Sequence, residues 1–171
     1  MKKLLIFILL VFSINLYGQT ERQLHEVHAS FIFNLTKYIV WSNENNGNAN
    51  FVIGIWGDEE LFKSTNNWYN GKQKGSKKIA VKNIKTLDEI YDCDLLYLGS
   101  GKINQFEAVK VSVAGQPILL VTDQQYYGKK GASVNLPLLD DRIKIELNMT
   151  SLNAASFKVS TSLSSISKLI N

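Results

Sequence analysis

The stretch FVIGIWGDEEL, residues 51–61, decides the fold of this chain. Residues 51–55 form a short apolar run with β-branched members, which is typical of a buried strand. Gly57 ends the run, and residues 58–60 then place carboxylates where the partial positive charge of a helix N-terminus favours them. A strand that passes through a glycine turn into a helix is the repeating unit of an α/β fold. We therefore predict a strand followed by a helix that runs to about residue 68.

The same alternation of strand and helix continues along the chain. Strand candidates lie at residues 79–84, 94–98 and 117–122, and helix candidates lie at residues 87–91 and 104–113. Thr86 stands where it can N-cap the first of these helices. The run PILLVT, residues 117–122, is apolar throughout, which is typical of a central strand that is covered on both faces.

The pattern changes after residue 122. Residues 132–136 and 142–147 alternate in polarity around a turn that contains Pro137, which favours an antiparallel hairpin. Residues 151–170 carry apolar side chains at helical spacing and are predicted to form one final helix. The predicted fold class is therefore α/β: a three-layer α/β/α domain with a mostly parallel sheet and an antiparallel hairpin at the C-terminal side.

Before the first strand, residues 21–41 are predicted to form a helix. Apolar side chains recur there every three or four positions and so share one face: Leu24, Val27, Phe31, Leu35 and Tyr38. Residues 42–50 are almost entirely polar and are predicted to be a loop.

The N-terminus has the pattern of a secretory signal peptide. Lys2 and Lys3 precede an unbroken apolar run over residues 4–12, and a small residue, Gly18, precedes a polar stretch. The run is too short to cross a bilayer, which needs about 20 apolar residues. We expect residues 1–18 to be removed and residues 19–171 to form a single exported domain in the periplasm of a bacterium.

Composition excludes several classes of protein. The chain has 171 residues, 45% of them hydrophobic, which excludes disorder, and its single cysteine excludes a disulfide scaffold. The formal charge is +4, but two of the lysines belong to the predicted signal peptide. The remaining domain is nearly neutral, and it therefore lacks the strong positive charge that nucleic-acid-binding proteins carry.

Two features suggest a ligand site, and each has a simpler interpretation. The turn of residues 99–102 (GSGK) follows a strand and precedes a helix, where backbone N–H groups can hold an anion; the alternative is a plain tight turn. His25 and His28 lie one helical turn apart and would bind a metal if a third ligand joined them. His28 lies on the apolar side of the helix, however, which favours packing in the core, and we expect no metal and no cofactor.

Catalytic groups are not apparent in the sequence. Cys93 has no histidine near it in the sequence and is interpreted as a small buried residue, with an intermolecular disulfide as the alternative. The adjacent carboxylates Asp58/Glu59 and Asp140/Asp141 are typical of solvated charge rather than of an acid/base pair. We therefore expect a protein that is not an enzyme.

Five segments, taken in order, resemble one known family. They are ASFIFNLTKYIVW (29–41), FVIGIWGDEEL (51–61), ILLVTD (118–123), GKKGASVNLPLLDDRIKIELN (128–148) and KVSTSLSSISKLI (158–170). The first resembles the signature Phe-Ile-Tyr-Asn-Phe-x-Lys-Phe-x-x-Trp of the YfiR family of periplasmic proteins. Matching residues are Phe31, Phe33, Asn34, Lys37 and Trp41. The chain departs from the family in having Ser42 after Trp41, and in having only Cys93 where some relatives carry cysteine pairs.

The resemblance implies a periplasmic regulator that binds a membrane-bound signalling partner of the diguanylate cyclase type. It places the protein in cyclic di-GMP signalling, and we expect a homodimer. An alternative is a small-ligand-binding or sensor module that serves a histidine kinase or a transport system, with its ligand held by the loops at the carboxyl ends of the parallel strands. Polar and aromatic residues at element ends or on motif positions are the candidate partner- or ligand-binding residues: Asn34, Lys37, Trp41, Asp58, Asp123, Arg142 and Asn148.

Overall fold

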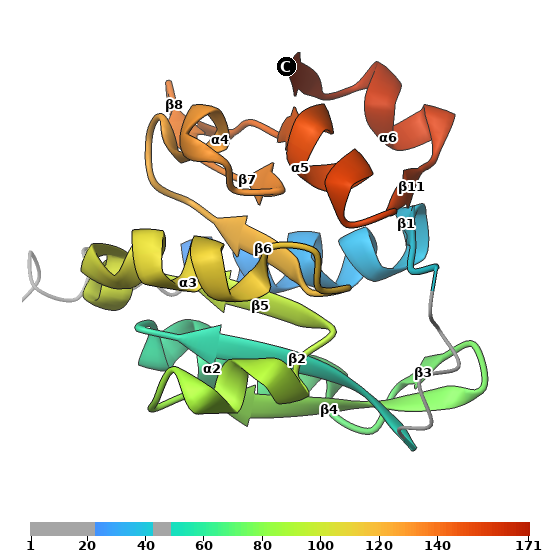
Figure 1. Cartoon of the computed structure of the whole chain (residues 1–171). Helices are drawn as coiled ribbons and strands as arrows, with labels where there is room; N and C mark the ends of the chain where they lie inside the picture. Colours follow the sequence, from blue (N-terminus) through green and yellow to red (C-terminus); the bar gives the residue numbers. More distant parts are fainter. Residues whose placement is uncertain (1–22, 43–48) are drawn as a thin grey trace, which may run out of the picture.

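A mixed eight-stranded sheet forms the centre of the computed structural model, which describes residues 23–42 and 49–171 (Figure 1). In spatial order the strands are β12 (Lys168–Ile170), β10 (Glu146–Asn148), β7 (Val134–Asn135), β6 (Leu119–Thr122), β5 (Leu95–Leu98), β2 (Asn50–Trp56), β4 (Lys77–Asn83) and β3 (Gln73–Lys74). The signal peptide predicted at residues 1–18 and most of the polar loop predicted at residues 42–50 lie outside the described residues.

The sheet is mostly parallel, which confirms the predicted α/β class. The neighbouring strands β4, β2, β5, β6 and β7 all run parallel to one another. The predicted C-terminal hairpin is also confirmed, because β7 and β10 pair antiparallel with Val134 opposite Leu147. Between them the chain adds a small second hairpin, β8 (Leu138–Leu139) and β9 (Arg142–Ile143).

Helices supply the rest of the core. They are residues 23–38, α2 (Glu59–Tyr69), α3 (Phe106–Val113), α4 (Tyr127–Lys130), α5 (Met149–Ala154) and α6 (Thr161–Ser165), with short 3₁₀ helices η1 (Asp88–Asp92) and η2 (Ser100–Gln105). The predicted helix start at Asp58 is confirmed, since its carboxylate accepts a hydrogen bond from Leu61 N at 2.9 Å. Within the described ranges, no helix has the length and apolar character needed to cross a bilayer.

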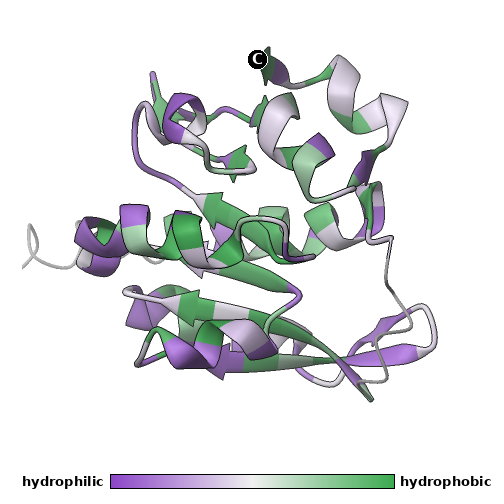
Figure 2. Ribbon diagram, viewed as in Figure 1, coloured by the Kyte–Doolittle hydropathy of each residue, from purple (hydrophilic) through white to green (hydrophobic). Residues whose placement is uncertain are grey.

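Hydrophobic core lies on both faces of the sheet, because side chains of a strand alternate between faces. On β2, Ile53 and Ile55 join the cluster that contains the helix of residues 23–38, α2, α5 and α6. Val52 and Trp56 join the other cluster, which contains α3 and η1. Figure 2 shows the hydrophobic colour concentrated on β2, β5 and β6. The chain therefore buries apolar surface on both sides of one central sheet.

A row of polar side chains crosses one half of the sheet. Thr122, Asn135, Glu146 and Lys168 lie opposite one another on the neighbouring strands β6, β7, β10 and β12. Thr122 Oγ1 donates to Asn135 Oδ1 at 2.7 Å, and Asn135 Nδ2 donates to Glu146 Oε2 at 2.9 Å. Lys168 Nζ donates to the other Glu146 oxygen at 3.3 Å. We name this set the polar row; it satisfies a carboxylate that is only 7% exposed.

The single final helix predicted for residues 151–170 is wrong. The segment forms α5, a strand β11 (Lys158–Val159), α6 and the edge strand β12. Ser156 adopts a positive φ of 59°, and the Ser160 hydroxyl starts a new helix by accepting a hydrogen bond from Leu163 N. Strand pairing then overrides the helical spacing, because Val159 pairs with Ile39 and Leu169 pairs with Leu147.

The first helix ends earlier than predicted, and only part of its predicted apolar face is buried. It stops at residue 38 because β1 (Ile39–Val40) pairs with β11. Val27 and Tyr38, both assigned to the buried face, are 46% and 43% exposed, whereas Ile32 is fully buried. The Thr86 cap is also wrong, because Leu87 precedes η1 and makes no side-chain capping bond.

Candidate functional site

A cluster of titratable side chains lies where the first helix meets the carboxyl ends of the central parallel strands. Asp58 follows β2, Tyr97 lies near the end of β5, and Asp123 follows β6. His25 and His28 come from the first helix, one turn apart. Because the carboxyl ends of parallel strands meet at one edge of a sheet, the fold brings these residues together. We name them the carboxyl-end cluster.

The cluster fastens the helix to the sheet. His25 Nδ1 lies 3.4 Å from Asp58 Oδ2, while the other Asp58 oxygen caps α2. His28 Nε2 lies 3.3 Å from the backbone oxygen of Leu136, and its ring centroid is 6.4 Å from that of Tyr97. His28 is 4% exposed and Tyr97 is fully buried. The two histidines therefore contact a loop and a strand that are far from them in sequence.

Burial sets the protonation of two members of the cluster, His28 and Tyr97. It lowers the pKa of His28 below the usual 6.5, although the Asp123 charge opposes that effect. Burial, followed by the Asp123 charge, raises the pKa of Tyr97 well above 10.0. At neutral pH His28 is therefore neutral and Tyr97 keeps its proton, which suits a packed contact rather than proton transfer.

Acidification should destabilise the protein through His28. Because its pKa is lowered on folding, the unfolded chain binds a proton below pH 6.5 that the folded chain does not. The contribution to the free energy of unfolding is therefore fully present above pH 6.5 and is lost as the pH falls through the folded-state pKa. Urea unfolding on both sides of pH 6.5 measures it.

The matched variants separate the two histidines. His28→Gln should flatten the fall of unfolding free energy with acid, whereas His25→Gln, one turn away on the same helix, should retain it. An equal fall in the wild type and in His28→Gln would contradict the assignment to His28.

Two of the predicted site residues belong to the cluster, Asp58 and Asp123. Three others lie elsewhere at or near the surface. Lys37 Nζ donates to Asn34 Oδ1 at 3.2 Å on the first helix, and Arg142 is exposed on β9. Tyr97 is a member of the cluster that the sequence pattern does not reveal, because it lies inside the apolar strand run DLLYL and resembles an ordinary core residue.

The last two predicted site residues are buried and have structural contacts. Trp41 is 3% exposed, and its indole N–H donates to the Asp94 carbonyl at 3.0 Å. Asn148 is 6% exposed, accepts from Ser151 N at 2.8 Å as the cap of α5, and donates to the Gly128 carbonyl at 2.8 Å. Neither side chain is presented to a partner at the surface.

The turn of residues 99–102 is a tight turn whose amide groups are already used. Gly99 N donates to the Trp56 carbonyl at 2.8 Å, and Gly101 N donates to the Gly57 carbonyl at 3.1 Å. Lys102 N donates back to the Gly99 carbonyl at 3.1 Å. An anion at this place would have to displace these bonds, so the structure favours the simpler interpretation.

The metal and thiol candidates also receive structural explanations. Across residues 23–42 and 49–171, no group of three or more His, Cys, Asp or Glu side chains is arranged to hold a metal ion. Cys93 is buried against Gly54, and burial raises the pKa of its thiol to about 12. A thiol that keeps its proton at neutral pH is a poor nucleophile.

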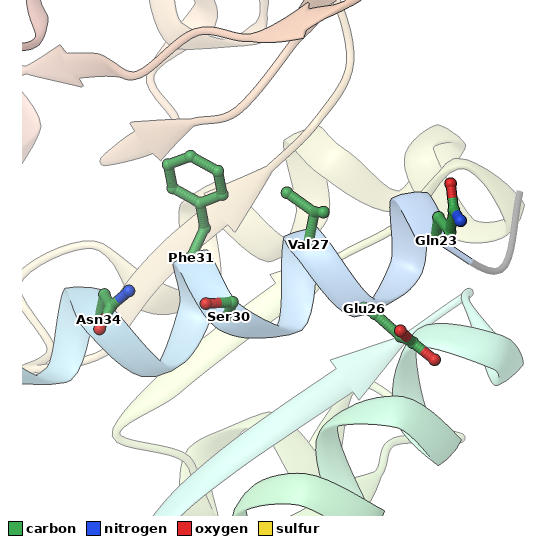
Figure 3. Close-up of a pocket in the computed structure, with 6 residues that line it drawn as sticks. All are labelled: Gln23, Glu26, Val27, Ser30, Phe31 and Asn34. Atoms are coloured by element: carbon green, nitrogen blue, oxygen red, sulfur yellow. The ribbon is translucent and has the colours of Figure 1, made fainter. Parts of the chain in front are cut away.

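An apolar surface lies on the outer side of the first helix. A groove of about 460 Å³ is lined by Gln23, Glu26, Val27, Ser30, Phe31 and Asn34. Figure 3 shows Val27 and Phe31 projecting from the same side of this helix. A second groove, of about 660 Å³, begins at the same Phe31 and continues over Leu139, Ile143 and Ile166. We name Val27, Phe31, Leu139, Ile143 and Ile166 the Phe31 surface.

Comparison with known proteins assigns the chain to a family. A family model described as YfiR/HmsC-like matches residues 25–168, which include both the carboxyl-end cluster and the Phe31 surface. A comparison with curated proteins found no match. Because the match covers most of the chain, this protein belongs to the YfiR/HmsC-like family.

Proposed function

We propose that this protein binds and restrains a membrane-bound signalling protein of the diguanylate cyclase type from the periplasmic side. Membership in the YfiR/HmsC-like family supports a periplasmic regulator of the YfiR type rather than an enzyme. The observation that carries the proposal is the Phe31 surface. Apolar side chains gathered at a protein surface and rimmed by polar groups are typical of protein–protein contact sites.

Restraint requires that the regulator bind one conformational state of its partner more tightly than the other. The Phe31 surface suits that role because it is built on helix and hairpin elements that are tied to the core. Ile166 is 72% exposed and Val27 is 46% exposed, so both reach a partner without unfolding. Asn34 lines one groove and Lys144 lines the other, so each groove has a polar side chain beside its apolar residues. Arg142 is exposed one residue before Ile143 on β9.

A pull-down from solubilised membranes tests the partner class. The tagged protein should recover an integral membrane protein with a cytoplasmic cyclase domain, and cells that lack the regulator should contain more cyclic di-GMP. Recovery of no inner-membrane signalling protein, together with unchanged cyclic di-GMP, would count against the proposal.

Ile166→Asp should weaken capture of that partner at least about tenfold, which corresponds to about 1.4 kcal/mol of binding free energy. A buried charge at the centre of an apolar contact leaves a carboxylate without water or a partner. The readout is the dissociation constant for the periplasmic part of the partner, measured by calorimetry.

Val111→Asp is the matched control, because Val111 on α3 is also 72% exposed but lies outside the Phe31 surface. It should leave the affinity unchanged. Equal weakening by both variants would show that added charge, rather than the surface, is responsible. Sedimentation of both variants also tests the expected homodimer. If two copies pair through the Phe31 surface, Ile166→Asp should shift the protein toward the monomer and Val111→Asp should not.

A further inference from the structure

Lysines gather at the end of the molecule opposite the carboxyl-end cluster. Residues 71–78 contain four lysines but no aspartate or glutamate, and they include the β3–β4 hairpin. The hairpin lies at the amino end of β4, and Figure 2 shows it in the hydrophilic colour. Within the described residues, this hairpin therefore brings several lysines together at one end of the fold.

Aromatic rings hold several of these lysines in place. Phe33 of the first helix stacks on Tyr69 of α2 with centroids 4.3 Å apart. Lys37 Nζ lies 4.3 Å from the Phe33 centroid, and Lys72 Nζ lies 5.0 Å from that of Tyr69. These cation–π contacts link the two lysines to one aromatic pair and keep their charges close together.

The hairpin adds two more lysines from directly opposed positions. Lys74 lies opposite Lys77 in the β3–β4 register, so the hairpin places these two lysines side by side. Lys74 Nζ also lies 5.0 Å from the Trp41 centroid and 4.8 Å from that of Phe51.

Apolar side chains are exposed beside this charge. Tyr38 is 43% exposed next to Lys37, and Val40 is 50% exposed. Val40 pairs in β1–β11 with Lys158, which is itself exposed. We name Lys37, Lys72, Lys74, Lys77 and Lys158, together with Tyr38 and Val40, the basic tip.

We propose that the basic tip docks on an anionic lipid surface, with phosphatidylglycerol as the headgroup class. Lysines near a bilayer add their attractions to anionic headgroups, while aromatic and aliphatic side chains enter the interfacial region. Lysines beside exposed aromatic and aliphatic side chains match the charged headgroups and the interfacial layer of a bilayer, so we commit to a lipid as the occupant. The inference rests on the proposed periplasmic function, since docking would hold the regulator beside a partner in the inner membrane.

Vesicle flotation tests the inference with protein purified from the periplasmic fraction of expressing cells. The probes are vesicles of phosphatidylethanolamine with phosphatidylglycerol, and vesicles of phosphatidylcholine alone. The protein should float with the first and not with the second, and binding should fall as salt is raised, because screening shortens the range of the attraction. Absence from the periplasmic fraction would contradict the proposed location, whereas failure to float would contradict only the lipid inference.

Charge removal at the tip gives the decisive comparison. The triple variant Lys72→Gln, Lys74→Gln, Lys77→Gln should lower the partition coefficient between vesicles and water about a hundredfold. Each lysine near an anionic surface strengthens binding about fivefold. The control Lys102→Gln, Lys129→Gln, Lys130→Gln removes the same charge from exposed lysines outside the tip and should retain binding. A second pair within the tip, Lys37→Gln with Lys158→Gln, should lower binding at least about tenfold and guards against misfolding of the hairpin.

Two results would overturn the inference. Equal loss in the tip and control variants would mean that net charge alone drives binding. Preferential binding to polyglutamate, with no retention on phosphatidylglycerol vesicles, would assign the tip to an acidic protein instead.

Discussion

Trp41→Ala should lower the free energy of unfolding by about 3–5 kcal/mol, the range for removal of a buried aromatic side chain. The Trp41 ring packs edge-on against Phe51 and Phe157, with centroid distances of 4.9 and 5.4 Å. Its loss opens a cavity between the first helix, β2 and the C-terminal segment, and removes the bond to the Asp94 carbonyl. Chemical unfolding followed by far-ultraviolet circular dichroism measures the change without relying on the tryptophan itself.

Trp68→Ala is the control, because Trp68 on α2 is 55% exposed and its removal leaves no enclosed cavity. It should cost well under half as much. Trp41→Phe should fall between the two, since it keeps a ring in the core but loses the indole donor. Equal stability of the Trp41→Ala and Trp68→Ala variants would refute the structural role of Trp41.

Asn135→Leu, at the centre of the polar row, should lower the free energy of unfolding by about 3 kcal/mol or more. The amide accepts from Thr122 and donates to Glu146, so leucine deprives two buried groups of a partner at once. Glu146 keeps only Lys168, whose side chain is 64% exposed. Denaturant unfolding at neutral pH gives the magnitude.

The double variant Asn135→Leu, Glu146→Leu supplies the internal test. Removing the Glu146 carboxylate as well should recover part of the lost unfolding free energy, because two apolar side chains leave no buried charge without a partner. Asn67→Leu, at an exposed position on α2, is the matched surface control and should be nearly neutral. Additive effects of the two row substitutions would contradict the coupling inferred from the hydrogen bonds.

The sequence predicted those parts of the fold in which the local hydrophobic pattern and the contacts in the folded structure favour the same secondary structure. The segment from β2 to α2 was predicted because an apolar run, a glycine and a capping aspartate lie within a few residues. The segment of residues 151–170 was not, because its helical spacing competes with a pairing to Ile39 that is remote in the chain. Serine hydroxyls such as that of Ser160 then bond to nearby backbone and start and stop short helices, which hydrophobic spacing does not report.

The same distinction applies to the candidate site residues: some follow from local sequence pattern, and others depend on contacts made only in the folded structure. Asp58 and Asp123 were predicted because the carboxyl ends of parallel strands meet, which follows from the fold class alone. The contribution of Tyr97 depends on its burial beside Asp123, which a strand pattern does not reveal. Trp41 matches a family motif position, yet its place is the core; a tryptophan at an element end has the same sequence signal whether it faces a partner or its own fold.

The contacts that attach the first helix and the residues after it to the rest of the fold affect the order of folding. The helix is held by the Leu136 carbonyl, 108 residues from His28, by pairing of β1 with β11, and by a Ser42 hydroxyl bond to Ser156. The segment synthesised early thus gains its attachment from segments synthesised late, and such distant closures are slow to form. The first helix of a nascent chain would therefore lack these attachments until the last third of the chain is synthesised. Late folding of this kind is compatible with the export that the predicted signal peptide leads us to expect.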